Sequence, residues 1–196
     1  MLRLFSVMLA ALIAAAPAFA GKKVGGVDIP TSLQFSGQDL QLVGAGVRSK
    51  FFVDVYVAAL YQSAADVETD KSTDTLDAAA VIEADKPLDI RVYIISDLIT
   101  ADRFAESAHD GFVRSTHGDL APINKEVDTM IRTFRNALSK GDVFDLVYVP
   151  GTGTEIYRNN ELQETVPGLK FKQAMAGIWL SDDPVQNSLK DKMLGH

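Results

Sequence analysis

The sequence contains no cysteine, only one tryptophan and only three histidines among its 196 residues. Without cysteine the fold cannot depend on disulfide bonds, and zinc sites built from cysteine, thiol nucleophiles and iron–sulfur clusters are all excluded. The protein must therefore be held together by its apolar core.

Positive charge is also scarce. The chain has 19 lysines and arginines against 26 aspartates and glutamates, for a formal net charge of −7. The basic residues form no cluster, and a protein that binds nucleic acid needs such a cluster to contact phosphates. We therefore expect no nucleic-acid partner.

Long apolar runs are missing except at the N-terminus. Arg3 precedes an apolar stretch over residues 4–16, and the small residues Ala18 and Ala20 follow it. This arrangement predicts a secretory signal peptide cleaved after Ala20. The stretch is short for a membrane span, so an uncleaved anchor is the weaker alternative. We expect a periplasmic or secreted protein with no stable membrane span after cleavage, and residues 21–196 fit a single domain.

The most strongly β-patterned stretch covers residues 40–61. From Phe51 onward both faces of the strand are largely apolar, which predicts a central strand covered on both sides. Gly44 and Gly46 indicate a place where the backbone bends or another group approaches closely. Residues 49–50 are the expected hinge into the central strand.

The other elements alternate between strand and helix patterns. Asp89 and Arg91 are expected on an exposed side of their strand. The last helix is expected to start at Asp182-Asp183-Pro184. The order predicts an α+β fold with one large sheet. Strands are expected at 27–35, 88–95, 143–149, 154–158 and 162–166, and helices within 62–74 and at 75–84, 100–115, 124–140 and 173–180.

Arg48 and Tyr56 are the polar residues that most favour a function. On one straight strand they would lie roughly 26 Å apart, at ~3.3 Å per residue. If the chain folds back near residues 49–50, a forked guanidinium and a phenol can both reach one small anion. The alternative is that Arg48 pairs with an acid such as Asp54 while Tyr56 packs in the core.

Other groups of residues give weaker indications of a function. His109 and His117 share a helix face only if one helix spans both, and no third ligand is evident, so we predict no metal site. Residues 151–154 (GTGT) have the composition of a hairpin turn rather than of a phosphate-binding loop. The sequence has no Gly-x-Ser-x-Gly elbow of the kind found in esterases. No cofactor is expected.

Two stretches resemble a known family. Residues 44–61, GAGVRSKFFVDVYVAALY, resemble the chalcone isomerase family, and residues 177–195, GIWLSDDPVQNSLKDKMLG, are similar to its bacterial exported branch. The order of elements is compatible with the family over residues 30–196. The resemblance implies an open-faced β-sandwich, in which a layer of helices covers a large antiparallel sheet and a ligand cleft lies between them.

The resemblance also implies a chemistry. Plant members close a chalcone to a flavanone, using an arginine to stabilise the developing enolate while threonine and tyrosine hydroxyls organise a water. The family arginine falls on Arg48 and the threonine on Tyr56. The family tyrosine falls near Arg103–Phe104 and a late polar position near Ile178, so both hydroxyls are replaced by apolar side chains. These departures argue against isomerase activity.

An arginine followed by a tyrosine on the next strand resembles the fatty-acid-binding members of the same fold. The resemblance implies a non-catalytic, exported binder of fatty acids or related lipophilic carboxylates, with Arg48 and Tyr56 holding the carboxylate and Phe104 and Trp179 lining the pocket. Two alternatives stay open. One is a chalcone isomerase-type intramolecular lyase acting on an unknown enone, with Arg48 and Tyr56 catalytic. The other is an envelope accessory protein with a vestigial cleft and an unknown protein partner.

Overall fold

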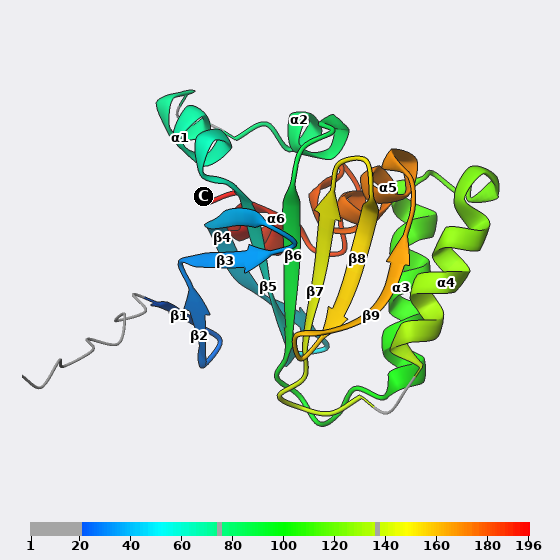
Figure 1. The fold of residues 1–196 in the computed structure, drawn as a ribbon. Helices are drawn as coiled ribbons and strands as arrows, with labels where there is room; N and C mark the ends of the chain where they lie inside the picture. Colours follow the sequence, from blue (N-terminus) through cyan, green and yellow to red (C-terminus); the bar gives the residue numbers. More distant parts are fainter. Residues whose placement is uncertain (1–20, 74–75, 136–137) are drawn as a thin grey trace, which may run out of the picture.

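The structure is a computed structural model that describes residues 21–73, 76–135 and 138–196, so the expected signal peptide at 1–20 lies outside the described residues. Seven strands form one antiparallel sheet in sequence order (Figure 1). A separate two-stranded hairpin precedes them, made of β1 (Gly21–Val24) and β2 (Val27–Pro30). The sheet comprises β3 (Ser32–Phe35), β4 (Gln38–Lys50), β5 (Val53–Ser63), β6 (Leu88–Ile94), β7 (Val143–Val149), β8 (Gly153–Arg158) and β9 (Glu161–Val166).

Helices cover one face of this sheet. In Figure 1 the helices α3, α4 and α5 stand on one side of the sheet and the β1–β2 hairpin on the other. The expected α+β fold, a large antiparallel sheet covered by a layer of helices, is confirmed. No helix within the described ranges is long and apolar enough to cross a membrane. The helices are α1 (Ala64–Thr73), α2 (Ala78–Glu83), α3 (Ala101–Ser115), α4 (Asn124–Phe134), α5 (Leu169–Leu180) and α6 (Asn187–Met193).

Helix α3 begins where the sequence predicted. The Thr100 hydroxyl accepts a hydrogen bond from the backbone N–H of Arg103 at 3.3 Å, which satisfies one of the free donors at a helix N-terminus. The buried Phe104 and Phe112 then point toward the core. This cap places the start of α3, and with it Phe104, at one end of the sheet.

Four helix ends differ from the prediction, and the first is the start of α2, which lies at Ala78 rather than 75. Helix α4 ends at Phe134 rather than 140, because the chain after it already joins the sheet, where the N–H of Gly141 donates to the carbonyl of Ile94. Helix α5 begins at Leu169, four residues earlier than expected. Helix α6 begins at Asn187 instead of Pro184, because the N–H of Val185 donates to the carbonyl of Ile178 and holds the preceding residues against the end of α5.

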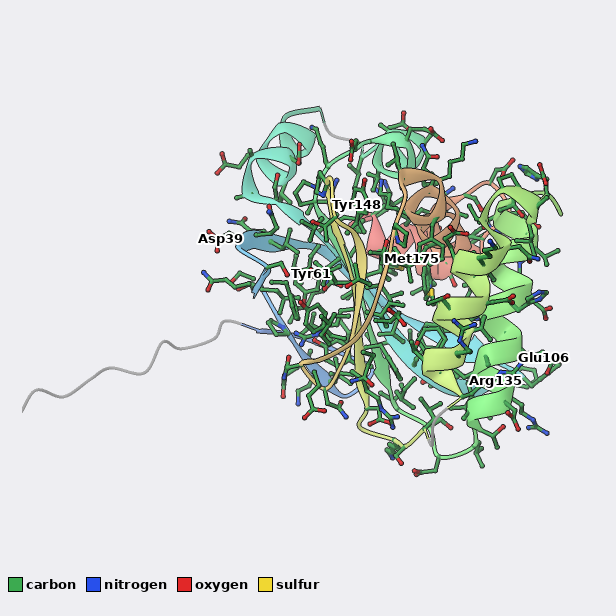
Figure 2. The ribbon with its side chains drawn as sticks, turned by 45° about the vertical axis from the view of Figure 1, so that its right-hand side comes forward. Asp39, Tyr61, Glu106, Arg135, Tyr148 and Met175 are labelled. Atoms are coloured by element: carbon green, nitrogen blue, oxygen red, sulfur yellow. The ribbon has the colours of Figure 1, made fainter. Side chains whose placement is uncertain are left out.

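The central strand β5 is covered on both faces, as predicted. Alternate residues beginning with Tyr56 face the helices, and the residues between them, beginning with Val57, belong to a second apolar cluster on the opposite face. Figure 2 shows Tyr61 and Met175 on opposite sides of the sheet. The sheet is therefore the middle of three layers along β5.

The third layer is the N-terminal hairpin together with the curled first edge of the sheet. The Tyr61 hydroxyl donates to the carbonyl of Pro30 at 2.8 Å, which ties the hairpin to β5. The rings of Phe35 and Tyr157 lie 4.9 Å apart, so the end of β3 reaches β8 across this face. The Ser36 hydroxyl also bonds the Glu155 carboxylate.

This third layer explains why one prediction about β6 was wrong. Asp89 and Arg91 were expected to be exposed, but Asp89 is fully buried and Arg91 nearly so. Arg91 Nε lies 2.7 Å from Asp145 Oδ1, and Asp89 Oδ1 accepts a hydrogen bond from the N–H of Leu146. The sheet face that carries Asp89 and Arg91 has polar residues at alternate positions of β6, but the hairpin and β3 cover it.

Gly44 and Gly46 mark a close approach, as the sequence indicated, and the approaching group is helix α6. A Cβ atom added at Gly44 would lie 2.3 Å from the carbonyl oxygen of Lys192, and one at Gly46 would lie 2.8 Å from Lys192 Cβ. Only glycine allows the helix to pack directly on the backbone of β4. This packing brings the start of α6 next to Arg48.

Candidate functional site

The β4–β5 hairpin places Arg48 and Tyr56 opposite each other. The chain folds back at Phe51 and Phe52, just beyond the hinge expected at 49–50, and the two residues become direct partners on neighbouring strands. The register shifts next to this pair, leaving Val55 as an extra residue on β5. Such a bulge changes the direction of the neighbouring side chains, and here it lies where the strand passes into the turn.

Arg48 is held by neutral partners. Its Nη1 donates to the carbonyl of Ser49 at 2.5 Å and to Oε1 of Gln186 at 3.0 Å. Among the described residues it forms no ion pair with a carboxylate. The alternative pairing with Asp54 is not found, because Asp54 instead accepts a hydrogen bond from the Ser49 hydroxyl at 2.6 Å. The guanidinium is therefore held without a direct carboxylate contact among the described residues.

Tyr56 is a buried phenol beside this charge. The Trp179 indole Nε1 donates to the Tyr56 hydroxyl at 3.0 Å. Burial raises the pKa of Tyr56, and this effect exceeds the lowering by the Trp179 hydrogen bond and by the charges of Arg48 and Arg114. The hydroxyl is therefore protonated at neutral pH. Since indole and guanidinium groups only donate, neither can accept the phenol proton.

A pocket opens in front of this pair. Its volume is about 540 Å³, within the range of small-molecule sites. The end of the β4–β5 hairpin, the loop after β6 and the first half of α3 form its walls. Arg48, Tyr56, Phe104 and Leu98 are among the lining residues, and Glu106, labelled in Figure 2, lies on the α3 side.

A second cavity of about 30 Å³ lies deeper, under the helices. It shares Tyr56, Phe104 and Ser107 with the larger pocket and is otherwise mainly apolar. Phe104 packs edge-on against Tyr56 with ring centroids 6.3 Å apart. Trp179 and Ile178 line this inner cavity and not the larger pocket. Of the four predicted site residues, three therefore line the larger pocket, and Trp179 supports Tyr56 from behind.

His109 and His117 do not belong to the same helix. His109 lies in α3, whereas His117 follows the end of that helix in a left-handed backbone conformation, so the two do not share a helix face. The described residues contain no group of three histidine, aspartate or glutamate side chains that could hold a metal ion.

Sequence reasoning missed Gln186. Its Oε1 accepts from both Arg48 Nη1 and the N–H of Ser49, and its Nε2 donates to the carbonyl of Val47 at 3.3 Å. Gln186 thus clamps the end of β4 from the start of α6. Its position inside the stretch 177–195, which resembles the bacterial branch of the family, was the signal that could have identified it.

Comparisons with known proteins agree on the fold. A family model described as chalcone isomerase-like matches residues 21–195. No curated protein gives a significant match. The crystal structure of an Arabidopsis thaliana fatty-acid binding protein is similar with a TM-score of 0.66 and 18% sequence identity, covering 86% of this chain and 92% of that chain. At this identity the similarity shows a shared fold.

Proposed function

The chain belongs to the chalcone isomerase-like family, and on that premise we propose that it is an exported, non-catalytic binder of fatty acids or related lipophilic carboxylates. The carboxylate would lie against Arg48 and Tyr56, and the tail would occupy the pocket between the sheet and α3.

One observation carries this proposal: Arg48 and Tyr56, which are paired across the β4–β5 hairpin and line the pocket, can both donate to a ligand. The Arg48 guanidinium has no carboxylate partner among the described residues, and the protonated Tyr56 hydroxyl, which accepts from Trp179, has its own proton to donate. A carboxylate supplies two acceptor oxygens and a negative charge, which matches a guanidinium and a phenol proton together.

The walls of the pocket support a lipophilic tail. Val55, Ile99 and Phe104 form an apolar part of its lining. The family positions for two hydroxyls are occupied by the buried Phe104 and by Ile178, which lies in the inner cavity. Neither of these two side chains has a hydroxyl that could orient the water needed for cyclisation of a chalcone, so the two positions favour binding over catalysis. The fatty-acid binding protein of the same fold supports this ligand class.

The test is binding of palmitic acid, measured by calorimetry and by the rise in melting temperature. We expect Arg48→Ala to weaken binding by about ten- to a hundredfold, because a charge-assisted hydrogen bond contributes roughly 1.5–3 kcal/mol. Arg132→Ala, which changes an exposed arginine on α4, is the matched control and should leave binding unchanged.

Two results would contradict the proposal. One is equal palmitate affinity of the wild type and Arg48→Ala. The other is acceleration of chalcone cyclisation above the spontaneous rate that disappears in Arg48→Ala, which would show catalysis instead. Export is tested separately: the protein recovered from its host should begin at Gly21, and an intact N-terminus would contradict cleavage after Ala20.

A further inference from the structure

Three large apolar side chains are exposed to solvent around the mouth of the pocket. Phe51 is 85% exposed and Phe52 fully exposed, both in the β4–β5 turn, and Leu98 in the loop after β6 is 69% exposed. They are three of the five large hydrophobic side chains that are exposed in the described part of the chain. Phe51 and Leu98 also line the pocket.

The turn itself is costly. Phe51 and Phe52 both have left-handed backbone conformations, with φ of 50° and 68°. A two-residue hairpin of this kind favours asparagine and glycine, because other side chains are strained there. Phenylalanine is unfavourable in this backbone conformation, and neither phenyl ring is buried in the core. Backbone strain combined with exposure indicates that these two residues serve a function other than stabilising the fold.

The shape of this group favours a lipid surface over a protein. Two phenyl rings and one leucine can bury only about 400–600 Å² on this side, whereas each partner of a stable protein interface buries about 800 Å². Insertion into a bilayer requires no complementary partner shape. Lys50 Nζ lies 5.9 Å from the Phe51 ring centroid, and Arg103 lies at the same mouth, where both can reach headgroup phosphates.

We propose that Phe51, Phe52 and Leu98 form a docking tip that inserts into the surface of a phospholipid bilayer and turns the pocket mouth toward it. Glu106 and Asp110 also lie at the mouth, and the chain is acidic overall, so the partner is a zwitterionic surface rather than a strongly anionic one. Transfer of a lipophilic carboxylate between bilayer and pocket would follow from this docking and rests on the proposed function, whereas the docking does not.

The test is flotation of the purified protein with vesicles of pure phosphatidylcholine. The wild type should float, and Phe52→Gly should reduce the bound fraction on the order of tenfold or more, because one fully exposed phenyl ring is lost. Phe52→Gly should also raise the melting temperature, since glycine relieves the left-handed strain, and this excludes misfolding as the cause. Leu162→Ala, which truncates an exposed leucine on β9, is the control and should float like the wild type.

Three results would overturn the docking tip: a wild type that does not float, flotation unchanged in Phe52→Gly, or a concentration-dependent dimer that only Phe52→Gly abolishes. Palmitate binding without vesicles separates this inference from the proposed function. Phe52 does not line the pocket, so Phe52→Gly should keep the wild-type palmitate affinity. A protein that floats but binds no palmitate would refute the proposed function and leave the tip in place.

Discussion

Gln186 determines how Arg48 is presented to the pocket. Its amide oxygen accepts from the guanidinium and from the N–H of Ser49, so the side chain of Arg48 is held in place by a neutral group. A carboxylate at the same position would hold the arginine equally well but would neutralise it. Replacing the amide of Gln186 by a carboxylate therefore tests whether a neutral clamp on Arg48 matters for binding.

Gln186→Glu should weaken palmitate binding by about tenfold, because an internal carboxylate then competes with the ligand for Arg48. The substitution is nearly isosteric, so the melting temperature without ligand should fall little or rise. Calorimetric titration measures the affinity, with Gln163→Glu on the exposed face of β9 as the control. An affinity equal to that of the wild type would show that Arg48 does not contact the ligand carboxylate.

The short helix α2 depends on a lysine from another element. Lys172 on α5 is fully buried, and its Nζ donates to the carbonyls of Val81, Ile82 and Ala84 at 2.7–2.8 Å. These are carbonyls at the C-terminal end of α2, which lack partners within a helix. Burial lowers the pKa of Lys172 to about 8, so the ammonium form with its three donors prevails at neutral pH.

Lys172→Met should destabilise the protein by about 2–4 kcal/mol, because it leaves three carbonyls in a buried region without their donor. Urea unfolding followed by circular dichroism measures the loss. Lys170→Met, two residues earlier on the exposed side of α5, is the control and should change stability by less than about 0.5 kcal/mol. Equal stabilities of the two variants would mean that α2 does not need this cap.

At the level of elements, the sequence predicted most strands and the start of α3, because alternation and a capping threonine are local signals. It placed the starts of α5 and α6 wrongly, because those ends depend on contacts with other elements, such as that between Val185 and Ile178. The candidate site was likewise predicted only where it depends on local signals. The approach of Arg48 and Tyr56 followed from one hairpin, whereas Gln186 reaches Arg48 from 138 positions away.

The whole molecule carries a buried acid pair in the layer opposite the pocket. Asp89 on β6 and Asp145 on β7 face Arg91 and lie near Tyr61 and Tyr93. Burial, reinforced by the charge of Asp145, raises the pKa of Asp89 well above its usual value. Burial raises the pKa of Asp145 to about 6, although Arg91 opposes this. Alternation along β6 suggested a solvated face here, because it cannot distinguish water from a second layer of protein.

This pair should make the folded state less stable as the pH rises from about 4 to about 6 and above. Both folded-state pKa values lie above those of an unfolded chain, so the folded protein retains protons that the unfolded chain releases, and this stabilisation is lost as the carboxyls ionise. Asp89→Asn mimics the protonated acid at every pH and should flatten the decline. Melting temperatures across this range measure it, and parallel curves for the two proteins would contradict the assignment.

The separation between Arg48 and Gln186 also has a consequence for the order of events during synthesis. The β4–β5 hairpin is made early and can pair with itself at once, whereas α6 is added more than a hundred residues later. Until then the guanidinium has no clamp and the glycines of β4 have no helix on them. A nascent chain therefore has the pocket's first wall before the proposed carboxylate site is complete. We expect any cargo to be taken up after the ribosome has finished, by the completed protein in whichever compartment it folds.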